Sequence, residues 1–450
     1  MRPDLAAKYD LRVPRYTSYP TAPHFHPGVT GDTYGQWLGA LPADAPLSLY
    51  LHIAYCAEMC WFCGCHTKIT KQYAPIADYM DALWREIDMV AERLPTRMTA
   101  RHVHFGGGSP TILSPEDFVA TVDRLRKRFL VAEDAEVAVE LDPRTADEDY
   151  VRAMAGAGVT RASIGQQDFN PTVQKAINRI QPYDVTAQVI NWLRKHGVPE
   201  INMDLVYGLP YQTTESLLET IDLAVGFSPR RISLFGYAHV PWMKKHQKLI
   251  PEEALPDIEE RWRQYDAARG RLINDHGYVQ VGLDHFALPD DEMAKALADK
   301  RLHRNFQGYT TDAAPVLLGF GASGIGSLPQ GYVANDGGIH SYKDTIRSGR
   351  LAVARGIAIS GDDRLRRALI ERLMCDLSLD VDAVCAEFGA DPAQFDRELD
   401  SLANMQADGL LTRQGRTIAV TEEGRPLVRA ACAVFDRYLK PGEARHSKAV

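Results

Sequence analysis

The stretch "LSLYLHIAYCAEMCWFCGCHT" (residues 47–67) joins an apolar, strand-like run to four of the chain's seven cysteines, Cys56, Cys60, Cys63 and Cys65. Disulfide bonding would require an oxidising compartment, usually with a secretory signal ahead of a small cysteine-rich domain. The first twenty residues, "MRPDLAAKYDLRVPRYTSYP", carry charges throughout and contain no apolar run of signal-peptide length. We therefore expect a reducing, cytoplasmic setting, where a cysteine cluster indicates metal binding.

The spacing of the first three cysteines, C-x3-C-x2-C, indicates the kind of metal site. Structural zinc sites usually join two separate ligand pairs, whereas Cys375, Cys385 and Cys432 lie isolated far downstream. Three thiolates on one loop suit three corners of a [4Fe–4S] cluster and leave the fourth iron for another ligand. A zinc knuckle closed by Cys65 or His66 is the alternative.

Composition limits the classes of partner. The chain has 450 residues, 45% of them hydrophobic and 24% charged, which is ordinary for a globular protein of two or three domains. Its formal net charge of -8 gives no overall attraction for nucleic acid or an anionic membrane. No run approaches the roughly 18 apolar residues of a membrane-spanning helix. We expect no nucleic-acid partner, no membrane span and a monomer.

Strand-like apolar runs alternate with amphipathic stretches along the first half of the chain. The predicted strands are residues 47–53, 101–105, 136–141, 160–165, 201–208 and 231–240. The stretches between them, such as residues 75–94 and 115–130, repeat apolar residues at helical spacing. The pattern predicts an α/β fold with a parallel sheet curved into a partial (β/α)6 barrel, whose chemistry lies at the carboxyl ends of the strands.

Glycines and polar residues follow several of these predicted strands. "GGGSP" (residues 106–110) follows the second, Glu140 and Asp142 the third, Gln167 the fourth and Asp204 the fifth. Glycine lets the backbone approach a ligand closely, and polar side chains at successive strand ends face one mouth of a barrel. The alternative for each residue is a tight turn or the cap of the next helix.

The cysteine loop resembles that of the radical S-adenosylmethionine (SAM) enzymes, and "GGGSP" is similar to their GGxPT motif. More specific segments resemble the oxygen-independent coproporphyrinogen III dehydrogenases of haem biosynthesis, in which Cys65 completes a CxxxCxxCxC pattern. These segments are "RYTSYPTA" (15–22), "NRIQ" (178–181), "FGYAHVPWMKKHQ" (235–247) and "RLHRNFQGYTT" (301–311). Ala54, Gln166 and Gly236 depart from the family pattern.

The resemblance implies one [4Fe–4S] cluster on Cys56, Cys60 and Cys63, and two SAM molecules in one site. Residues matching those around the cluster-bound SAM are Tyr50, Gly107, Glu140 and Ile325. Residues matching those around the second SAM are Phe62, Gly108, Ser109, Gln167, Arg179, Asp204 and Ala238.

The resemblance also implies a reaction. A 5′-deoxyadenosyl radical removes hydrogen from two propionates of coproporphyrinogen III, which become vinyl groups in protoporphyrinogen IX, with an electron donor and acceptor that the sequence does not identify. Four propionates need cationic partners in a net-acidic chain. The candidates are Arg15, Lys244, Lys245, His303 and Arg304, with His303 and Arg304 ranked highest. Cys65 is predicted to support catalysis without binding the cluster permanently. The alternatives are a haem-binding chaperone of the same superfamily and a non-catalytic iron–sulfur or zinc protein.

The predicted domains are an N-terminal extension (1–46), the partial barrel (47–285), a barrel elaboration that binds substrate (286–360) and a C-terminal domain (361–450). Helical stretches followed by two strand-like runs around "QG" (414–415) predict a mostly helical, winged-helix-like module. It lacks a concentrated basic stripe, so we expect it to pack over the barrel instead of binding DNA. Cys375, Cys385 and Cys432 fall at its apolar positions and are predicted to be buried.

Overall fold

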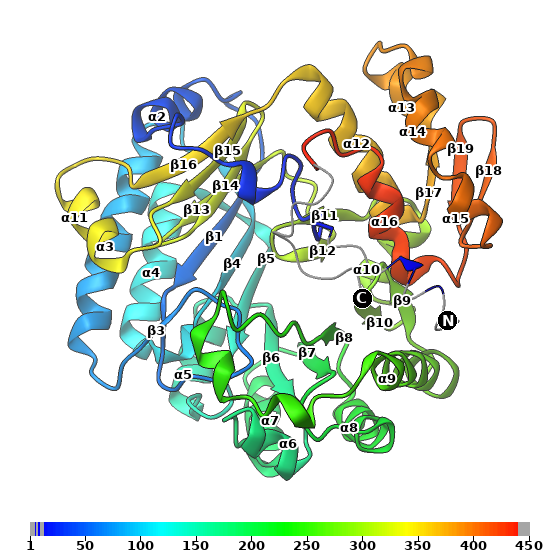
Figure 1. Ribbon diagram of the computed structural model, residues 1–450. Coiled ribbons are helices and arrows are strands. Elements are labelled where there is room, and N and C mark those ends of the chain that lie inside the picture. Colours follow the sequence, from blue (N-terminus) through cyan, green and yellow to red (C-terminus); the bar gives the residue numbers. More distant parts are fainter. Residues whose placement is uncertain (1–4, 6–7, 10–12, 440–450) are drawn as a thin grey trace.

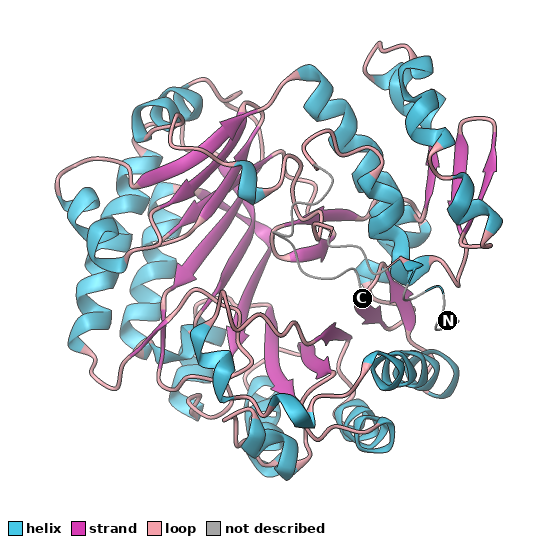
Figure 2. Ribbon diagram, in the orientation of Figure 1, coloured by secondary structure: helices cyan, strands magenta, loops and turns pink. Residues whose placement is uncertain are grey.

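A computed structural model describes residue 5, residues 8–9 and residues 13–439. Within this part of the chain, twelve strands form one sheet in the order β16-β15-β14-β13-β1-β4-β5-β6-β7-β8-β10-β9 (Figures 1 and 2). Six neighbouring strands run parallel: β1 (Leu47–Ile53), β4 (Thr99–Gly107), β5 (Leu130–Leu141), β6 (Arg161–Gln167), β7 (Glu200–Tyr207) and β8 (Arg231–Gly236). This is the parallel α/β sheet predicted from the six apolar runs. The last strand ends at Gly236, four residues before the predicted end.

Helices cover the outer face of the parallel strands, as Figure 2 shows for α3 and α4. The helices that follow these strands are α3 (Ala74–Ala91), α4 (Pro115–Arg128), α5 (Glu148–Gly156), α6 (Pro171–Ala176), α7 (Tyr183–Lys195), α8 (Thr214–Gly226) and α9 (Ile258–Gly270). Several begin at a side-chain cap: Ser114 accepts from the Asp117 amide, and Asp147 from the Tyr150 amide.

Strict alternation along the strands separates an apolar outer face from a polar inner face. In β1, Leu49 and Leu51 are buried against the helical layer, and the intervening Tyr50 and His52 point the other way. The parallel register places Tyr50 beside His104 of β4. The inner face therefore presents ionisable side chains toward the barrel mouth, where the predicted chemistry lies.

Further strands extend the sheet on both sides. On the side of β1 these are β13 (Val316–Phe320), which is parallel to β1, and the antiparallel β14 (Ile325–Leu328), β15 (Gly331–Asn335) and β16 (Val353–Ala358). On the side of β8 they are β10 (His285–Ala287) and β9 (Val279–Val281). The shorter elements around them are α2 (Gly31–Gly39), α10 (Glu292–Ala298), β11 (His303–Asn305), β12 (Gly308–Thr310) and α11 (Ile339–Arg347).

The C-terminal region forms a separate core opposite the sheet (Figure 1). Its helices are α12 (Gly361–Asp376), α13 (Val381–Glu387), α14 (Asp396–Asp400), α15 (Ala403–Ala407) and α16 (Val428–Ala433). Its small sheet contains β17 (Ser378–Asp380), β18 (Leu411–Gln414) and β19 (Thr417–Val420) in the order β17-β19-β18. Cys375, Cys385 and Cys432 are buried there, as predicted. The β18–β19 hairpin around "QG" is confirmed, whereas the three-residue β17 was not predicted. Residues 440–450 of the predicted domain lie outside the described part of the chain.

A buried carboxylate joins the middle of the elaboration, residues 321–342, to the barrel. Glu86 of α3 is 1% exposed and accepts hydrogen bonds from the Gly321 amide (2.7 Å), the Tyr342 hydroxyl (2.6 Å) and Asn335 Nδ2 (2.6 Å). Burial raises the pKa of Glu86 from 4.5 to about 7, although these three donors lower it in part. In the described part of the chain no helix is both long and apolar enough to cross a membrane.

Glu86 should make stability depend on pH. Because its folded-state pKa is raised, the folded protein retains the proton more strongly than the unfolded chain, and stability from this group falls as pH rises from about 4.5 to about 7. We expect the Glu86→Gln variant to lose this dependence, worth about 3 kcal/mol across that window. Denaturant unfolding at pH 5 and pH 8 measures it. The control is Glu219→Gln, at an exposed position of α8. An equal pH dependence of stability in wild type and Glu86→Gln would contradict the assignment of this dependence to Glu86.

Candidate active site

The cysteine loop begins where β1 ends. Cys56 lies in the short strand β2 (Tyr55–Cys56), which pairs with β3 (Lys68–Ile69) and so closes the loop that carries the other three cysteines. The Lys68 amide donates to the Ala54 carbonyl at 2.9 Å, and the Thr70 amide to the Cys56 carbonyl at 3.1 Å. The loop is thus fixed at the carboxyl end of β1, at the mouth of the barrel.

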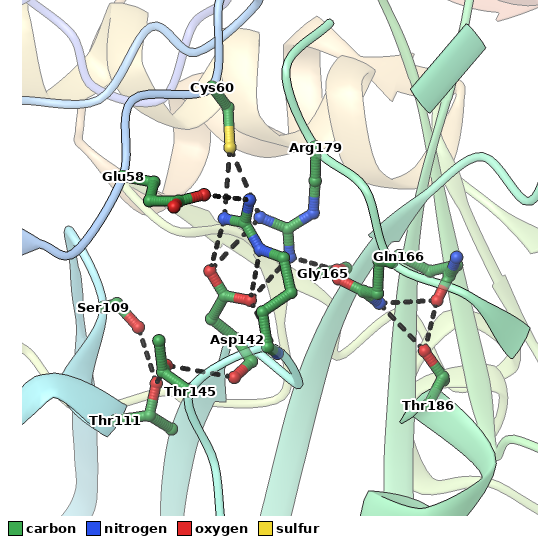
Figure 3. A network of polar contacts seen from close by, with 12 residues as sticks. Glu58, Cys60, Ser109, Thr111, Asp142, Thr145, Gly165, Gln166, Arg179 and Thr186 are labelled. Carbon is green, nitrogen blue, oxygen red and sulfur yellow. Dashed lines mark hydrogen bonds and ion pairs between the residues drawn. The ribbon is translucent and has the colours of Figure 1, made fainter. Parts of the chain in front are cut away.

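Two arginines converge on the Cys60 thiol (Figure 3). Arg144 Nη2 lies 3.3 Å and Arg179 Nη1 3.5 Å from Cys60 Sγ. Asp142 binds both guanidinium groups, at 2.7 Å from Arg144 and 3.4 Å from Arg179. Burial would raise the pKa of Asp142, but Arg179 and Arg144 lower it to about 2. Two guanidinium groups therefore place positive charge beside the Cys60 sulfur.

The remaining thiols have separate surroundings. Cys63 Sγ accepts from the Cys65 amide at 3.3 Å, and hydrogen bonds from the Cys65 side chain and backbone lower the pKa of Cys63. Cys56 Sγ accepts from Thr67 Oγ1 at 3.3 Å, and burial raises its pKa to about 11. Within the described chain no three His, Cys, Asp or Glu side chains are grouped to hold a single metal ion. The fit to a cluster therefore depends on the donor set, three thiols on one loop at the barrel mouth, since a [4Fe–4S] cluster binds each thiolate at a different iron.

A glycine turn at the end of β4 is tied to this loop. The Gly108 amide donates to the Ile53 carbonyl at 2.7 Å, and the Ser109 amide to the Tyr55 carbonyl at 2.9 Å. Gly107 has a φ of +111°, and a Cβ atom there would lie 2.7 Å from His52 Nδ1. Only glycine lets the backbone follow this path. Gly107, Gly108 and Ser109 are therefore held next to the cysteine loop.

Tyr50, Gly107, Glu140 and Ile325 lie on neighbouring strands. Glu140 Oε2 accepts from the Gly107 amide at 3.3 Å, and Glu140 Oε1 lies 3.1 Å from His104 Nε2. The Tyr50 and His104 rings stack at 5.8 Å. Ile325 begins β14, and its backbone packs against Gly319, the residue that β13 aligns with Tyr50. The structure brings these predicted residues to one side of the cysteine loop.

Three of the residues predicted around a second SAM lie on the β6–β7 side: Gln167, Arg179 and Asp204. Gln167 ends β6 with a φ of +68°. Arg179 Nη2 donates to the Gly165 carbonyl (Figure 3). Asp204 of β7 accepts from Ser163 Oγ at 3.1 Å and Asn202 Nδ2 at 3.0 Å, and burial and nearby Glu140 raise its pKa.

Phe62 and Ala238 belong to this side as well. Gln247 Nε2 donates to both of their carbonyls, at 3.1 Å and 3.2 Å. This bridge fixes the loop after β8 against the cysteine loop. Phe62 also packs against a small buried cluster around Val173 and Ile177.

His303 and Arg304 lie elsewhere, on β11. They line a cavity of about 230 Å³ together with Thr17, Phe306 and Glu371. His303 Nδ1 lies 3.3 Å from Glu371 Oε1, and this carboxylate raises the pKa of His303. Across residues 13–439, no hydrogen bond or ion pair joins either residue to the cysteine loop. The structure therefore separates these candidates from the cluster ligands.

Comparison with known proteins identifies the family of this chain. A family model for the Radical SAM superfamily matches residues 50–224, and one for the HemN C-terminal domain matches residues 359–427. The chain is 51% identical, over 100% of both chains, to an oxygen-independent coproporphyrinogen III oxidase of Bradyrhizobium diazoefficiens. It is 43% identical to the coproporphyrinogen III oxidase, anaerobic 1, of Cereibacter sphaeroides, over 98% of this chain and 97% of that one. The chain belongs to the oxygen-independent coproporphyrinogen III oxidase family.

A solved structure supports the same family. The coproporphyrinogen III oxidase HemN from Escherichia coli, described as a radical SAM enzyme, matches with a TM-score of 0.91 and 36% identity, over 95% of this chain and 100% of that one. Members of the radical SAM superfamily use a [4Fe–4S] cluster and SAM, so the family membership confirms these two cofactors and the oxidoreductase class. The haem-chaperone alternative is not favoured.

The structure accounts for one departure from the family pattern. Gln166, where an apolar residue was expected, is 1% exposed, and its Oε1 accepts from Gln181 Nε2 and Thr186 Oγ1, both at 2.6 Å. The network ties β6 to α7 (Figure 3), and Gln181 Oε1 is left without a hydrogen-bond partner among the described residues.

Sequence reasoning missed Arg144, His52 and His104. Arg144 follows Asp142 by two residues, so the "DPR" turn after β5 was a usable signal. His52 and His104 could have been found from the alternation of inward- and outward-facing residues along a strand, because each lies two residues from another residue of the inner face.

Proposed function

We propose that this chain catalyses the anaerobic oxidative decarboxylation of two propionates of coproporphyrinogen III to vinyl groups, giving protoporphyrinogen IX. The proposal is carried by the cysteine triplet, held beside two guanidinium groups at the barrel mouth, in a chain 51% identical to an enzyme of that name. Each round removes one hydrogen atom from a propionate β-carbon, then CO₂ and one electron, which leaves the carbon–carbon double bond.

Cys56, Cys60 and Cys63 would hold the cluster. When bound, the reduced cluster supplies the electron that cleaves the C–S bond of SAM and yields the 5′-deoxyadenosyl radical. Arg144 and Arg179 place positive charge at Cys60 and so offset the negative charge of a thiolate-bound cluster. The glycine turn presents backbone amides next to the loop, and Glu140 provides a half-exposed carboxylate for the hydroxyl or ammonium groups of a ligand.

Two SAM molecules are proposed in this site. Support comes from the strand order, which places Tyr50 on β1 and Glu140 on β5, and Gln167 and Asp204 further along the same parallel sheet on β6 and β7. Burial raises the pKa of Asp204 and the charge of Glu140 raises it further, so these two carboxyl groups, one from each set of predicted residues, interact electrostatically.

Asp204→Asn should weaken binding of the second SAM while leaving the cluster intact. The amide keeps the shape but loses the charge that strengthens hydrogen bonds from ribose hydroxyls, so we expect roughly a tenfold loss of affinity. Anaerobic equilibrium dialysis with labelled SAM should give a stoichiometry near one for the variant and near two for wild type. Two sites of unchanged affinity in the variant would refute this placement.

An arginine group on the inner side of the C-terminal domain is proposed to bind substrate propionates. It consists of Arg15, Arg261, Arg304 and Arg429. Arg304 Nη2 donates to the Arg15 carbonyl at 3.2 Å, and Arg261 lies over the Tyr207 ring at 5.7 Å. Burial and nearby Arg15 and Arg304 lower the pKa of Arg429 to about 10. Clustered cations in a chain of net charge -8 suit a ligand with several carboxylates.

Arg304 is the best placed member of the group. Only 8% of it is exposed, its guanidinium lies 4.3 Å from the centroid of Tyr309, and its buried Nη1 has no hydrogen-bond partner among the described residues. A buried donor without a partner costs about 1–3 kcal/mol, so a ligand carboxylate would satisfy it favourably. The group unites the N-terminal segment, β11, α9 and α16, which supports a substrate-binding role for the C-terminal domain.

Arg304→Gln should raise the KM for coproporphyrinogen III about 10- to 100-fold, because a charge-assisted hydrogen bond contributes about 1.5–3 kcal/mol. SAM cleavage without substrate should be unchanged. Steady-state kinetics under anaerobic conditions measures both values. Arg347→Gln, an exposed arginine of α11 paired with Asp78, is the matched control. If KM stays at the wild-type value in a folded Arg304→Gln variant, Arg304 does not bind the substrate.

The function itself is tested by anaerobic incubation with SAM, dithionite and coproporphyrinogen III. We expect protoporphyrinogen IX, detected as fluorescent protoporphyrin after oxidation. Retention of haem without consumption of coproporphyrinogen would instead indicate the chaperone alternative.

A further inference from the structure

A lysine-rich segment after β8 forms an unusual patch of surface. This lysine segment, "PWMKKHQKLI" (residues 241–250), contains three lysines and no acidic residue in a chain of net charge -8. Three of its large apolar side chains are exposed, Trp242 and Met243 at 65% each and Leu249 at 56%, whereas Ile250 is buried. Lys245 and Lys248 are also exposed and make no ion pair within residues 13–439. Grouped exposed apolar side chains with a charged rim are typical of a docking surface.

This segment lies directly on the cysteine loop. Lys244 Nζ donates to the Cys65 carbonyl at 3.1 Å, and His246 Nε2 lies 2.7 Å from the Cys63 carbonyl. In Figure 1 it is the green connection that follows β8. Ile180, another side chain that is 65% exposed, belongs to a loop whose Asn178 Nδ2 donates to the Met59 carbonyl at 2.8 Å. The exposed surface is therefore attached to the backbone of the loop that carries the thiols.

We propose that the lysine segment docks an acidic one-electron carrier protein, of the flavin or iron–sulfur class, which reduces the cluster. This proposal rests on the proposed function, because that chemistry requires an electron for each SAM cleaved. In the transfer, the reduced carrier loses one electron and the oxidised cluster gains it, with no bond formed or broken and no proton moved.

Charge explains why this surface fits an acidic partner. Two net-acidic proteins repel each other on average, so a local basic strip directs the partner to one face. Exposed Trp242 and Met243 then provide the apolar contact that excludes water at the centre of an interface. A partner seated there would bring its own redox centre against the loop that carries Cys63 and Cys65.

The test is a charge-reversal variant, Lys248→Glu, compared with Arg350→Glu, which changes the net charge equally at another exposed site. A flavodoxin and a ferredoxin, both acidic, serve as probes in anaerobic titration calorimetry, and each is then used in reduced form as the electron donor. A second variant, Trp242→Ala, tests the apolar contact without altering charge.

We expect the reversed variant to bind at least one carrier 10-fold or more weakly, and turnover with that carrier to fall similarly at low donor concentration. Turnover with dithionite should be unchanged, because a small reductant does not need the surface. The proposal is overturned if neither carrier binds wild type, if the Arg350→Glu control loses affinity equally, or if dithionite-driven turnover falls to the same extent. If dithionite supports no turnover even in wild type, the proposed function fails instead.

Discussion

Replacing Cys63 with serine should abolish the iron–sulfur absorption and reduce conversion of coproporphyrinogen III by at least about 1000-fold. Cys63 is one of three cysteines fixed at the carboxyl end of β1, and its thiol accepts the Cys65 amide hydrogen bond. A serine oxygen is a poor substitute for the thiolate that iron–sulfur clusters require. Because SAM cleavage needs the cluster, the loss should affect every later step.

Iron and sulfide analysis of anaerobically reconstituted protein, with electron paramagnetic resonance after reduction, measures this effect. Cys385→Ala is the matched control, since Cys385 is buried in α13 and should leave the cluster unchanged. A Cys63→Ser protein with four irons and normal turnover would remove Cys63 from the ligand set.

Cys65→Ser should separate cluster binding from catalysis. A fourth permanent thiolate would close the cluster and leave no iron for SAM, so Cys65 is proposed to support the reaction in another role. The Cys65 amide donates to Cys63 Sγ, and its carbonyl accepts from Lys244, so backbone atoms hold it beside the site. Serine preserves this backbone but removes a polarisable thiol that could relay hydrogen or electrons.

The expected Cys65→Ser protein keeps four irons and binds SAM but loses most of its conversion of coproporphyrinogen III. Parallel measurements of iron content, SAM-dependent spectral change and product formation distinguish the possibilities. Loss of the cluster would make Cys65 a ligand. Full turnover would reduce it to a packing residue.

The parallel sheet was predictable because each strand is a short apolar run flanked by turn residues. In β1, leucine alternates with Tyr50 and His52, so the sequence also indicates which side chains face the barrel mouth. The prediction failed only at the ends of single elements. The strand-like run that begins at residue 231 extends in the sequence to Val240, but the backbone leaves the sheet at Gly236. The strand β17 has three residues and is too short to show periodicity.

The site was less predictable than the sheet, because its decisive contacts join distant segments. Arg144 and Arg179 reach Cys60 from 84 and 119 residues away, and no periodicity in one sequence predicts that convergence. The arginine group is similar, since Arg15 and Arg429 come from opposite ends of the chain. Family resemblance supplied Arg179 and Arg304, whereas Arg144 and Arg261 emerged only from the fold.

The most direct measurement of the central claim uses coproporphyrinogen III deuterated at the propionate β-carbons. Under anaerobic conditions with SAM and reductant, wild type should form two molecules of 5′-deoxyadenosine for each protoporphyrinogen IX, and mass spectrometry should find deuterium in that 5′-deoxyadenosine. Formation of protoporphyrinogen IX without transfer of deuterium, or cleavage of SAM without any vinyl product, would contradict it.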